Sequence, residues 1–185
     1  GVYTNPSFVI NGAFVKKFHH GYVPCCMRID KYIRYDEPNV LKVSIRGTAL
    51  PNSRWYSGQG IYRDAWLLTG DRLHISQDGL HVTTLDCSEE LAQIEVTADV
   101  WNEGPSAREG YAELTVLDGS GKVVAERKAR FYADANGKVL VRQRLTLDKP
   151  NLWDVDSPNL YSVKCRLTDR GTGETVDCEE AAFGI

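Results

Sequence analysis

One segment near the middle of the chain gathers side chains that could hold a sugar. Residues 53–67 read SRWYSGQGIYRDAWL. The aromatic faces of Trp55 and Tyr56 would suit the apolar C–H faces of pyranose rings. Polar neighbours, Asn52, Arg54 and Asp64, could fix the hydroxyl groups. Because glycines at 58 and 60 break the chain before Ile61, we expect the two aromatics on a loop at a strand end.

Each of these side chains also has a purely structural interpretation. Trp55 and Tyr56 would pack against a neighbouring domain, and Asp64 would pair with Arg63 or another surface cation, which contributes little to stability. The Gly58-Gln59-Gly60 run superficially suggests a phosphate loop. We exclude that interpretation because a strand is expected after it, where a phosphate loop would open a helix.

The remaining reactive side chains predict neither a nucleophile nor a metal centre. The odd number of cysteines argues against a full disulfide framework. Neither the vicinal cysteine pair nor the vicinal histidine pair has zinc-ligand spacing, and no histidine lies in a nucleophile context. We therefore expect structural roles for Cys25, Cys26, Cys87, Cys165, Cys178, His19, His20, His74 and His81.

Composition excludes two classes of partner. The 185-residue chain has a net charge of −3 and no Lys/Arg cluster, so we expect no nucleic acid. No apolar run reaches the ~20 residues of a membrane span, so we expect no membrane. Residues 1–6 lack the basic start and apolar core of a signal peptide. The location of the intact protein, cytoplasmic or periplasmic/secreted, stays open.

Hydrophobic periodicity predicts strands almost throughout. In residues 92–100 apolar side chains alternate with polar ones, which is the period of a half-buried strand. No twelve-residue window shows a helical stripe. The predicted strands are 7–10, 13–18, 22–29, 39–46, 61–68, 72–76, 80–86, 91–102, 110–118, 122–132, 138–147, 160–169 and 174–183.

Turn signals separate these strands. Asn11-Gly12 between two apolar runs predicts a hairpin, because both residues tolerate positive φ. A second hairpin centred on Gly171 and Thr172 would place Cys165 directly opposite Cys178. A reduced, packed pair is the preferred state and a cross-strand disulfide is the alternative.

The fold class predicted is all-β, with a partial jelly-roll β-sandwich followed by an immunoglobulin-like β-sandwich. Residues 70–185 hold seven or eight strands with frequent turns, as such a sandwich does. Residues 1–69 hold only five, too few to close a jelly roll. We therefore expect an incomplete domain with an apolar face or an edge exposed. Its expected consequence is a homodimer induced by truncation, and the alternative is strongly mobile N-terminal strands.

Four motifs resemble the accessory domains of glycoside hydrolase family 2, in that family's order. Segment 53–67 resembles the end of its sugar-binding domain, and Val9-Ile10-Asn11-Gly12 with Gly21-Tyr22 resembles an earlier part of it. Residues 152–161 (LWDVDSPNLY) and 182–185 (AFGI) resemble the close of its second, immunoglobulin-like domain. In that close, Trp153 and Tyr161 are expected to be packing residues, and the resemblance covers nearly the whole chain.

The resemblance implies a (β/α)₈ catalytic barrel after these two domains. It also implies carbohydrate contacts, in the intact parent, at Asp64, Arg63, Trp55 and Tyr56. In some β-galactosidases of the family the acidic residue at the Asp64 position helps to hold a monovalent cation. The parent would use such a cation or Mg²⁺, and we expect no metal or other cofactor in this segment alone. Asp64 favours a β-galactosidase over a β-glucuronidase or β-mannosidase.

Catalytic carboxylates of the family are not predicted here. A retaining glycosidase needs two carboxyl groups ~5–5.5 Å apart. The glutamates of this chain lie in turns or on polar strand faces, outside any catalytic-type segment. The sequence therefore predicts a non-catalytic fragment of an enzyme that hydrolyses terminal β-galactosides. The alternative is a free-standing carbohydrate-binding or adhesive β-sandwich module.

Overall fold

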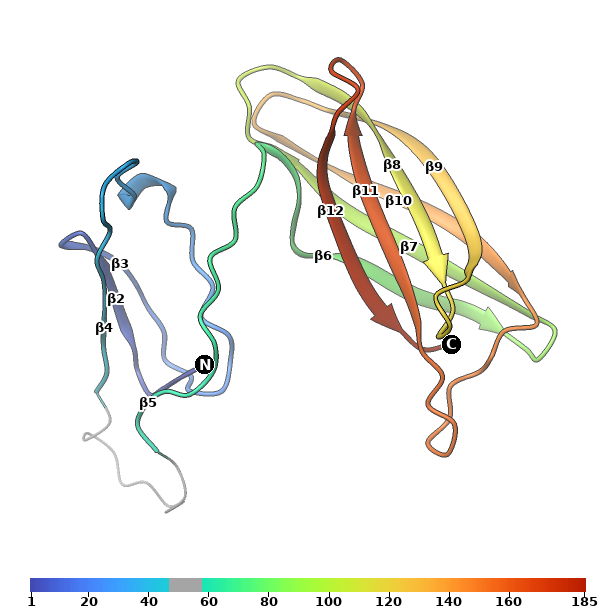
Figure 1. Cartoon of the computed structure of the whole chain (residues 1–185), viewed down its shortest axis with the longest axis horizontal. Helices are drawn as coiled ribbons and strands as arrows, with labels where there is room; N and C mark the ends of the chain where they lie inside the picture. The colour runs from blue at the N-terminus through green and yellow to red at the C-terminus, as the bar shows by residue number, and fades with distance from the viewer. Residues whose placement is uncertain (47–57) are drawn as a thin grey trace. The chain divides into compact units, whose positions relative to one another are not determined.

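The computed structural model describes residues 1–46 and 58–185, and it is built almost wholly of strands, as predicted (Figure 1). Within the described residues the only helix is a 3₁₀ turn at Asp30–Tyr32. The chain divides into two compact units, Gly1–Leu67 and Leu68–Ile185.

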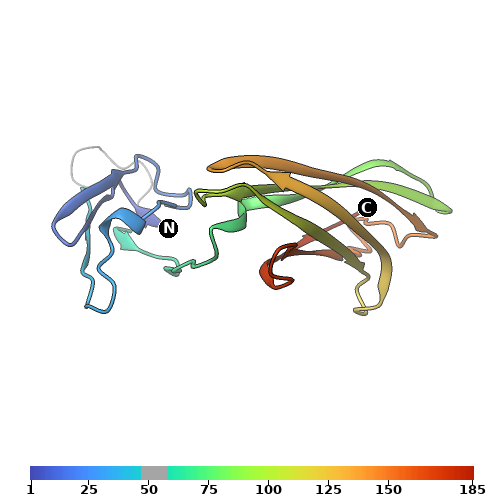
Figure 2. The same ribbon diagram turned by 90° about the horizontal axis from the view of Figure 1, so that it is seen from above.

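The second unit is a sandwich of two antiparallel sheets. One sheet has the strand order β10-β7-β6 and the other β12-β11-β8-β9, and the two layers are visible in Figure 2. The strands are β6 Leu73–Cys87, β7 Leu91–Asn102, β8 Arg108–Leu117, β9 Val123–Ala133, β10 Gly137–Asp148, β11 Tyr161–Asp169 and β12 Thr175–Phe183.

Strict alternation in the sequence produces the core of this sandwich. Along β7 the residues at even positions from Ala92 to Val100 are at most 1% exposed, while their neighbours face outward. The same period buries alternate residues of β8 and β11, including Leu114 and Val163. Since successive strand side chains point to opposite faces, one apolar row from each sheet meets the other in the middle.

The sheet order differs in one strand from the constant-type immunoglobulin arrangement. In that arrangement the fourth strand in sequence joins the sheet of the first two strands. Here β9, the fourth strand, pairs with β8 over their whole length. The sandwich is immunoglobulin-like, as predicted, with three strands in one sheet and four in the other.

The two short strands predicted at 72–76 and 80–86 are a single bulged strand, β6. The pairing with β7 shifts between Ile75 and Leu80, and Asp78 within the bulge has a φ of 53°. The backbone N–H of Ile75 donates to Asp177 Oδ2 on β12 at 2.7 Å. Because a carboxylate from the other sheet takes up this N–H, the bulge also ties the two sheets together.

The predicted pairing of Cys165 with Cys178 is wrong by one residue. A bulge between Leu167 and Thr168 shifts the register, so that Cys165 lies opposite Glu179 and Cys178 lies opposite Arg166. Cys165 is fully buried, Cys178 is exposed, and both are free thiols. A one-residue slip moves a side chain to the other face of the sheet, so no packed cysteine pair forms.

The first unit contains two small sheets. One has the order β3-β2-β4, and the other pairs β1 with β5. The strands are β1 Val2–Tyr3, β2 Ser7–Ile10, β3 Ala13–Lys17, β4 Leu41–Ser44 and β5 Gly60–Ile61. The predicted hairpin is confirmed at Asn11 and Gly12, whose φ values are 51° and 87°.

Two predicted strands of the first unit are wrong. Residues 22–29 form no strand, and Pro24 within them cannot donate a ladder hydrogen bond. The predicted strand 61–68 ends at Ile61, and Leu67 and Leu68 are 71% and 70% exposed. An apolar run alone does not make a strand; it also needs a neighbouring strand that satisfies its backbone groups.

Candidate functional site

Two of the family-like motifs meet in the first unit. Tyr3 on β1 pairs with Gly60 on β5, which positions the Tyr62 side chain. The Tyr62 hydroxyl donates to the backbone oxygen of Gly21 at 2.7 Å, and the rings of Tyr3 and Tyr22 lie 5.4 Å apart. The segments around 21–22 and 60–62 therefore come together, although 37 residues, 23–59, separate them in the sequence.

The predicted sugar contacts Arg63 and Asp64 directly follow Tyr62. The Arg63 guanidinium lies over the Tyr62 ring, 5.4 Å from its centroid, and Asp64 is exposed. No ion pair within residues 1–46 and 58–185 joins Arg63 to Asp64. Trp55 and Tyr56, together with Asn52 and Arg54, lie outside the described residues. A sugar contact in this segment stays a prediction.

Asn11 has a second role that the turn motif did not indicate. Its side chain donates to Tyr32 O and Asn39 Oδ1, and it accepts the backbone N–H of Val40. Asn39 in turn bonds both backbone groups of Arg34. The two asparagines therefore hydrogen-bond the 30–40 loop to the β2–β3 hairpin. This gives the Asn-Gly motif a structural explanation that needs no ligand.

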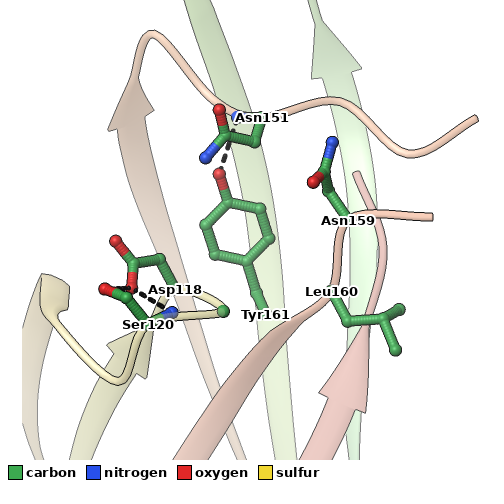
Figure 3. Close-up of a pocket in the computed structure, with 7 residues that line it drawn as sticks. Asp118, Ser120, Asn151, Asn159, Leu160 and Tyr161 are labelled. Carbon is green, nitrogen blue, oxygen red and sulfur yellow. Dashed lines mark hydrogen bonds between the residues drawn. The ribbon is translucent and has the colours of Figure 1, made fainter. Parts of the chain in front are cut away.

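Two adjoining hollows lie at one end of the sandwich, with volumes of about 360 and 370 Å³. They share Asp118, Asn151 and Tyr161. The first lies between the β8–β9 turn and the chain leading into β11 (Figure 3), and the second extends along the ends of β9 and β10. The first is lined by Asp118, Gly119, Ser120, Asn151, Asn159, Leu160 and Tyr161.

Internal hydrogen bonds occupy many of the polar groups of this end. Asp118 Oδ1 accepts the N–H groups of Ser120 and Lys122, and the backbone N–H of Asn151 donates to the Tyr161 hydroxyl at 2.7 Å (Figure 3). Ser120 Oγ also donates to Asp118, so these hydrogen bonds stay within the β8–β9 turn. These bonds explain the shape of the loops and hold the Asp118 carboxylate within its own turn.

Four glutamates of the sandwich, Glu95, Glu109, Glu113 and Glu180, form ion pairs with Lys or Arg of other strands or turns. Glu109 accepts from Arg130 and Arg170 at 2.7 and 2.6 Å, and Glu95 from Arg144. Hydrogen bonds from Arg170 and then Arg130 lower the pKa of Glu109. A general acid needs a raised pKa, so Glu109 is unsuited to that role. Neither hollow contains a glutamate.

Glu179 is the glutamate whose pKa is raised. Burial raises it first, and the nearby charges of Asp177 and Asp78 add to the effect. Glu179 lies on the edge strand β12, opposite Cys165, and lines neither hollow. Asp177 is committed to the backbone N–H of Ile75. We therefore assign this pair of carboxylates to the contact between the two sheets, where β12 meets β6.

The described ranges contain neither a metal-ligand cluster nor a membrane-spanning helix. In residues 1–46 and 58–185 no three His, Cys, Asp or Glu side chains lie close enough to hold a metal ion. Asp64 would be a single ligand, and hard cations such as Mg²⁺ take about six. The same ranges hold no helix long and apolar enough to cross a membrane.

The sequence patterns did not predict two polar networks of the sandwich. Arg108 bridges Asp71 and Asp169 at 2.8 and 2.7 Å, which fixes the chain where it enters β6. Asn102 is fully buried and joins the loops at 104–106 and 133–134. Arginine, aspartate and asparagine usually lie at the surface, so their burial here depends on partners distant in sequence.

Comparison with known proteins identifies the class. The model of the "Glycosyl hydrolases family 2" matches residues 73–185, the whole sandwich. The full chain also matches a solved family 2 member from Bacteroides cellulosilyticus, with a TM-score of 0.93 at 29% identity, and covers 25% of it. The chain belongs to glycosyl hydrolase family 2.

Curated relatives carry two kinds of name. "Beta-galactosidase BoGH2A" of Bacteroides ovatus is 36% identical over 90% of this chain, and "Putative beta-glucuronidase" of Formosa agariphila is 27% identical over 100% of it. The chain spans 20% and 17% of their lengths. A β-glucuronidase structure from Bacteroides uniformis matches with a TM-score of 0.87 at 25% identity, with 23% of it covered.

Proposed function

We propose that this chain is a non-catalytic accessory part of a family 2 glycoside hydrolase whose intact form hydrolyses terminal β-galactosides. The carrying observation is the match of the whole sandwich to the family, in a chain that spans only a fifth of a β-galactosidase relative. Glu109, Glu95 and Asp177 support it, because their carboxylates bond to groups of neighbouring strands. Its partner is a catalytic domain of the same polypeptide.

A β-glucuronidase is the second candidate. It is favoured by the name of one relative that matches the full chain and by the structural match to the enzyme from Bacteroides uniformis. The 36% identity to the β-galactosidase favours the first candidate. A free-standing binding module fits less well, since the relatives of this chain named above are all four to six times longer than the chain.

Substrate assays separate these candidates. The intact parent is expected to hydrolyse an aryl β-galactoside with a kcat/KM at least tenfold above that for the matching β-glucuronide. The reverse order would select the second candidate. The 185-residue chain alone should hydrolyse neither, and turnover lost on changing Glu95 or Glu109 to Gln would overturn the accessory role.

Within the parent, Asp64 is the residue proposed to contact the sugar. It is exposed and comes two residues after Tyr62, which bonds Gly21. Asp64→Asn in the parent should raise KM with little change in kcat, since a contact made equally in ground and transition states affects binding alone. An unchanged KM would exclude the contact. A response of KM to Na⁺ or Mg²⁺, lost in the variant, would indicate a cation completed by other parts of the parent.

We also propose that the isolated chain associates into a homodimer through its first unit. Phe14, Tyr35, Val40 and Leu41 are 54–78% exposed in that unit. Burial stabilises by ~25 cal/mol per Å², so several hundred Å² of such surface favours association. Sedimentation at micromolar concentration should show a dimer, and Phe14→Ser with Leu41→Ser should return a monomer. A monomeric unsubstituted chain would contradict the proposal.

A further inference from the structure

The first hollow at the end of the sandwich contains a buried hydroxyl group with an available donor. Tyr161, at the start of β11, is 5% exposed, and its hydroxyl accepts the backbone N–H of Asn151 at 2.7 Å (Figure 3). A tyrosine hydroxyl also donates one hydrogen bond. Within residues 1–46 and 58–185 no group accepts that bond. Since buried donors almost always find a partner, the acceptor has to come from what occupies the hollow.

Three further polar groups around the hollow are available in the same way. Asp118 accepts three hydrogen bonds, all at Oδ1, which leaves Oδ2 without one in the described ranges. The side-chain amide of Asn151 and the Oδ1 atom of Asn159 also make no hydrogen bond there. In Figure 3 Asp118 lies on one side of the Tyr161 ring and Asn159 on the other. The hollow therefore offers both donors and acceptors around one buried hydroxyl.

Internal contacts hold these groups in place. The Tyr161 ring stacks on Phe183, with the ring centroids 5.7 Å apart. Asn159 Nδ2 donates to Leu152 O at 2.9 Å, and the bonds within the β8–β9 turn fix Asp118. Because the groups are already ordered, a ligand would lose little binding free energy to ordering them.

Trp153 does not fill the hollow, although Trp153 and Tyr161 were both expected to pack at this end. The backbone of Trp153 bridges to Pro158 in a small hairpin between β10 and β11, and its side chain is 49% exposed. Val155 in the same hairpin is 81% exposed. Trp153 lines neither hollow, so its indole leaves the polar groups around Tyr161 uncovered.

The chemistry of the hollow fits a neutral ligand with several hydroxyl groups. A hydroxyl both donates and accepts, so one hydroxyl of the ligand can take the Tyr161 proton while another donates to Asp118 Oδ2. Leu160 is 51% exposed at the rim and offers an apolar surface to C–H groups. Asp118 is the one charged residue among those that line this hollow, and the Tyr161 donor disfavours a cation, which needs acceptors alone. A volume of about 360 Å³ is within the range of small-molecule sites.

We propose that this hollow binds a neutral saccharide through Asp118, Asn151, Asn159 and the Tyr161 hydroxyl. A pyranose ring combines hydroxyl groups with an apolar C–H face, which is the combination that Leu160 and these polar groups require. The inference goes beyond the proposed function, because it concerns the sandwich alone and does not depend on which glycoside the parent hydrolyses. With few contacts and an open rim, a single sugar ring should bind with a Kd of about 1–10 mM.

Titration of the ¹⁵N-labelled 185-residue chain with methyl β-galactopyranoside, followed by NMR, tests the site. Sorbitol is the control ligand, since it has a similar number of hydroxyl groups without a ring. Asn151→Ala removes an exposed amide and keeps the backbone bond to Tyr161, and Tyr161→Phe removes the hydroxyl and keeps the ring. Gln93→Ala is the matched control, because Gln93 is exposed on β7 and lines neither hollow.

The galactoside should cause saturable shifts at residues 118–122 and 151–161, and sorbitol should not. Asn151→Ala and Tyr161→Phe should each weaken binding about three- to tenfold, the loss of one hydrogen bond, while Gln93→Ala leaves it unchanged. If Tyr161→Phe loses the dispersed spectrum of the sandwich, Asn151→Ala decides. The absence of saturable shifts would mean that the hollow holds water only and would overturn the proposal. Equal shifts with sorbitol, or shifts confined to the surroundings of Asp64, would overturn it as well.

Discussion

Asn102 at the end of β7 offers the sharpest test of what holds the sandwich together. Its Nδ2 lies 2.8, 3.2 and 2.9 Å from the backbone oxygens of Ser106, Ala133 and Asp134, and its Oδ1 accepts the N–H of Gly104 at 3.0 Å. The residue is 0% exposed. One side chain therefore satisfies backbone groups of two loops that connect different pairs of strands.

The magnitude follows from the number of bonds that can form at once. An amide has two N–H donors, so Nδ2 makes two full bonds among its three acceptors, and Oδ1 makes a third. At about 1 kcal/mol net for each, Asn102→Ala should cost about 3 kcal/mol, with the exposed acceptors able to recover some of it from water. For a domain of this size, that is a loss of about 12 °C in Tm.

Urea unfolding of the chain, followed by circular dichroism, measures the change. Asn159→Ala is the control, because Asn159 is exposed and makes one bond to Leu152 O; it should cost less than about 1 kcal/mol. Asn102→Asp keeps the shape but directs a carboxylate at backbone oxygens, so at pH 7 it should be at least as destabilising as Ala. An Asn102→Ala variant no weaker than the control would refute the reasoning.

Three further predictions concern titratable groups. Burial alone would raise the pKa of Asp169, but hydrogen bonds from the Thr172 N–H, Arg108 and the Gly171 N–H outweigh it and lower that pKa from the ordinary 3.8; Asp169→Asn should therefore cost about 1–3 kcal/mol at pH 7, a difference that is lost in acid titrations of stability as the pH falls through the lowered pKa of the folded state. The pKa of Glu179 is raised, so its charge opposes folding at neutral pH; Glu179→Gln should raise Tm at pH 7, and a gain equally large below pH 4 would contradict the charge explanation. Burial raises the pKa of the Cys165 thiol to about 12, so in the folded chain a thiol reagent should modify exposed Cys178 and leave Cys165 intact, as mass mapping would show.

Period-two alternation was sufficient to predict the sandwich strands to within a few residues. In β7 and β11 the inward positions are apolar except at the last residue of each strand, Asn102 and Asp169, so local sequence and burial agree over most of their length. The pattern gave no warning of the bulges. The one extra residue of β12 opposite Leu167/Thr168, or the longer insertion between Ile75 and Leu80, changes which residues face each other and leaves the alternation of the flanking segments unaltered.

For the candidate site, the sequence was sufficient to predict which residues matter, and the fold was needed to show what surrounds them. The motifs around Gly21 and Tyr62 could be recognised in the sequence. The hydrogen bond that joins them depends on the pairing of β1 with β5, which the sequence pattern did not indicate. Asn102 and Asp169 resemble ordinary surface residues in the sequence. Their burial depends on partners 31 and 61 residues away, which no local pattern encodes.

The sequence by itself determined the all-β class, the hairpin at Asn11 and the family resemblance, because these depend on side-chain period, turn chemistry and motif order along the chain. Only the tertiary structure decided the register, the burial of polar networks and the exposure of Trp153 and Val155. Those properties follow from contacts between distant segments, where sheet pairing and the packing of two layers select one arrangement among many that the same pattern allows.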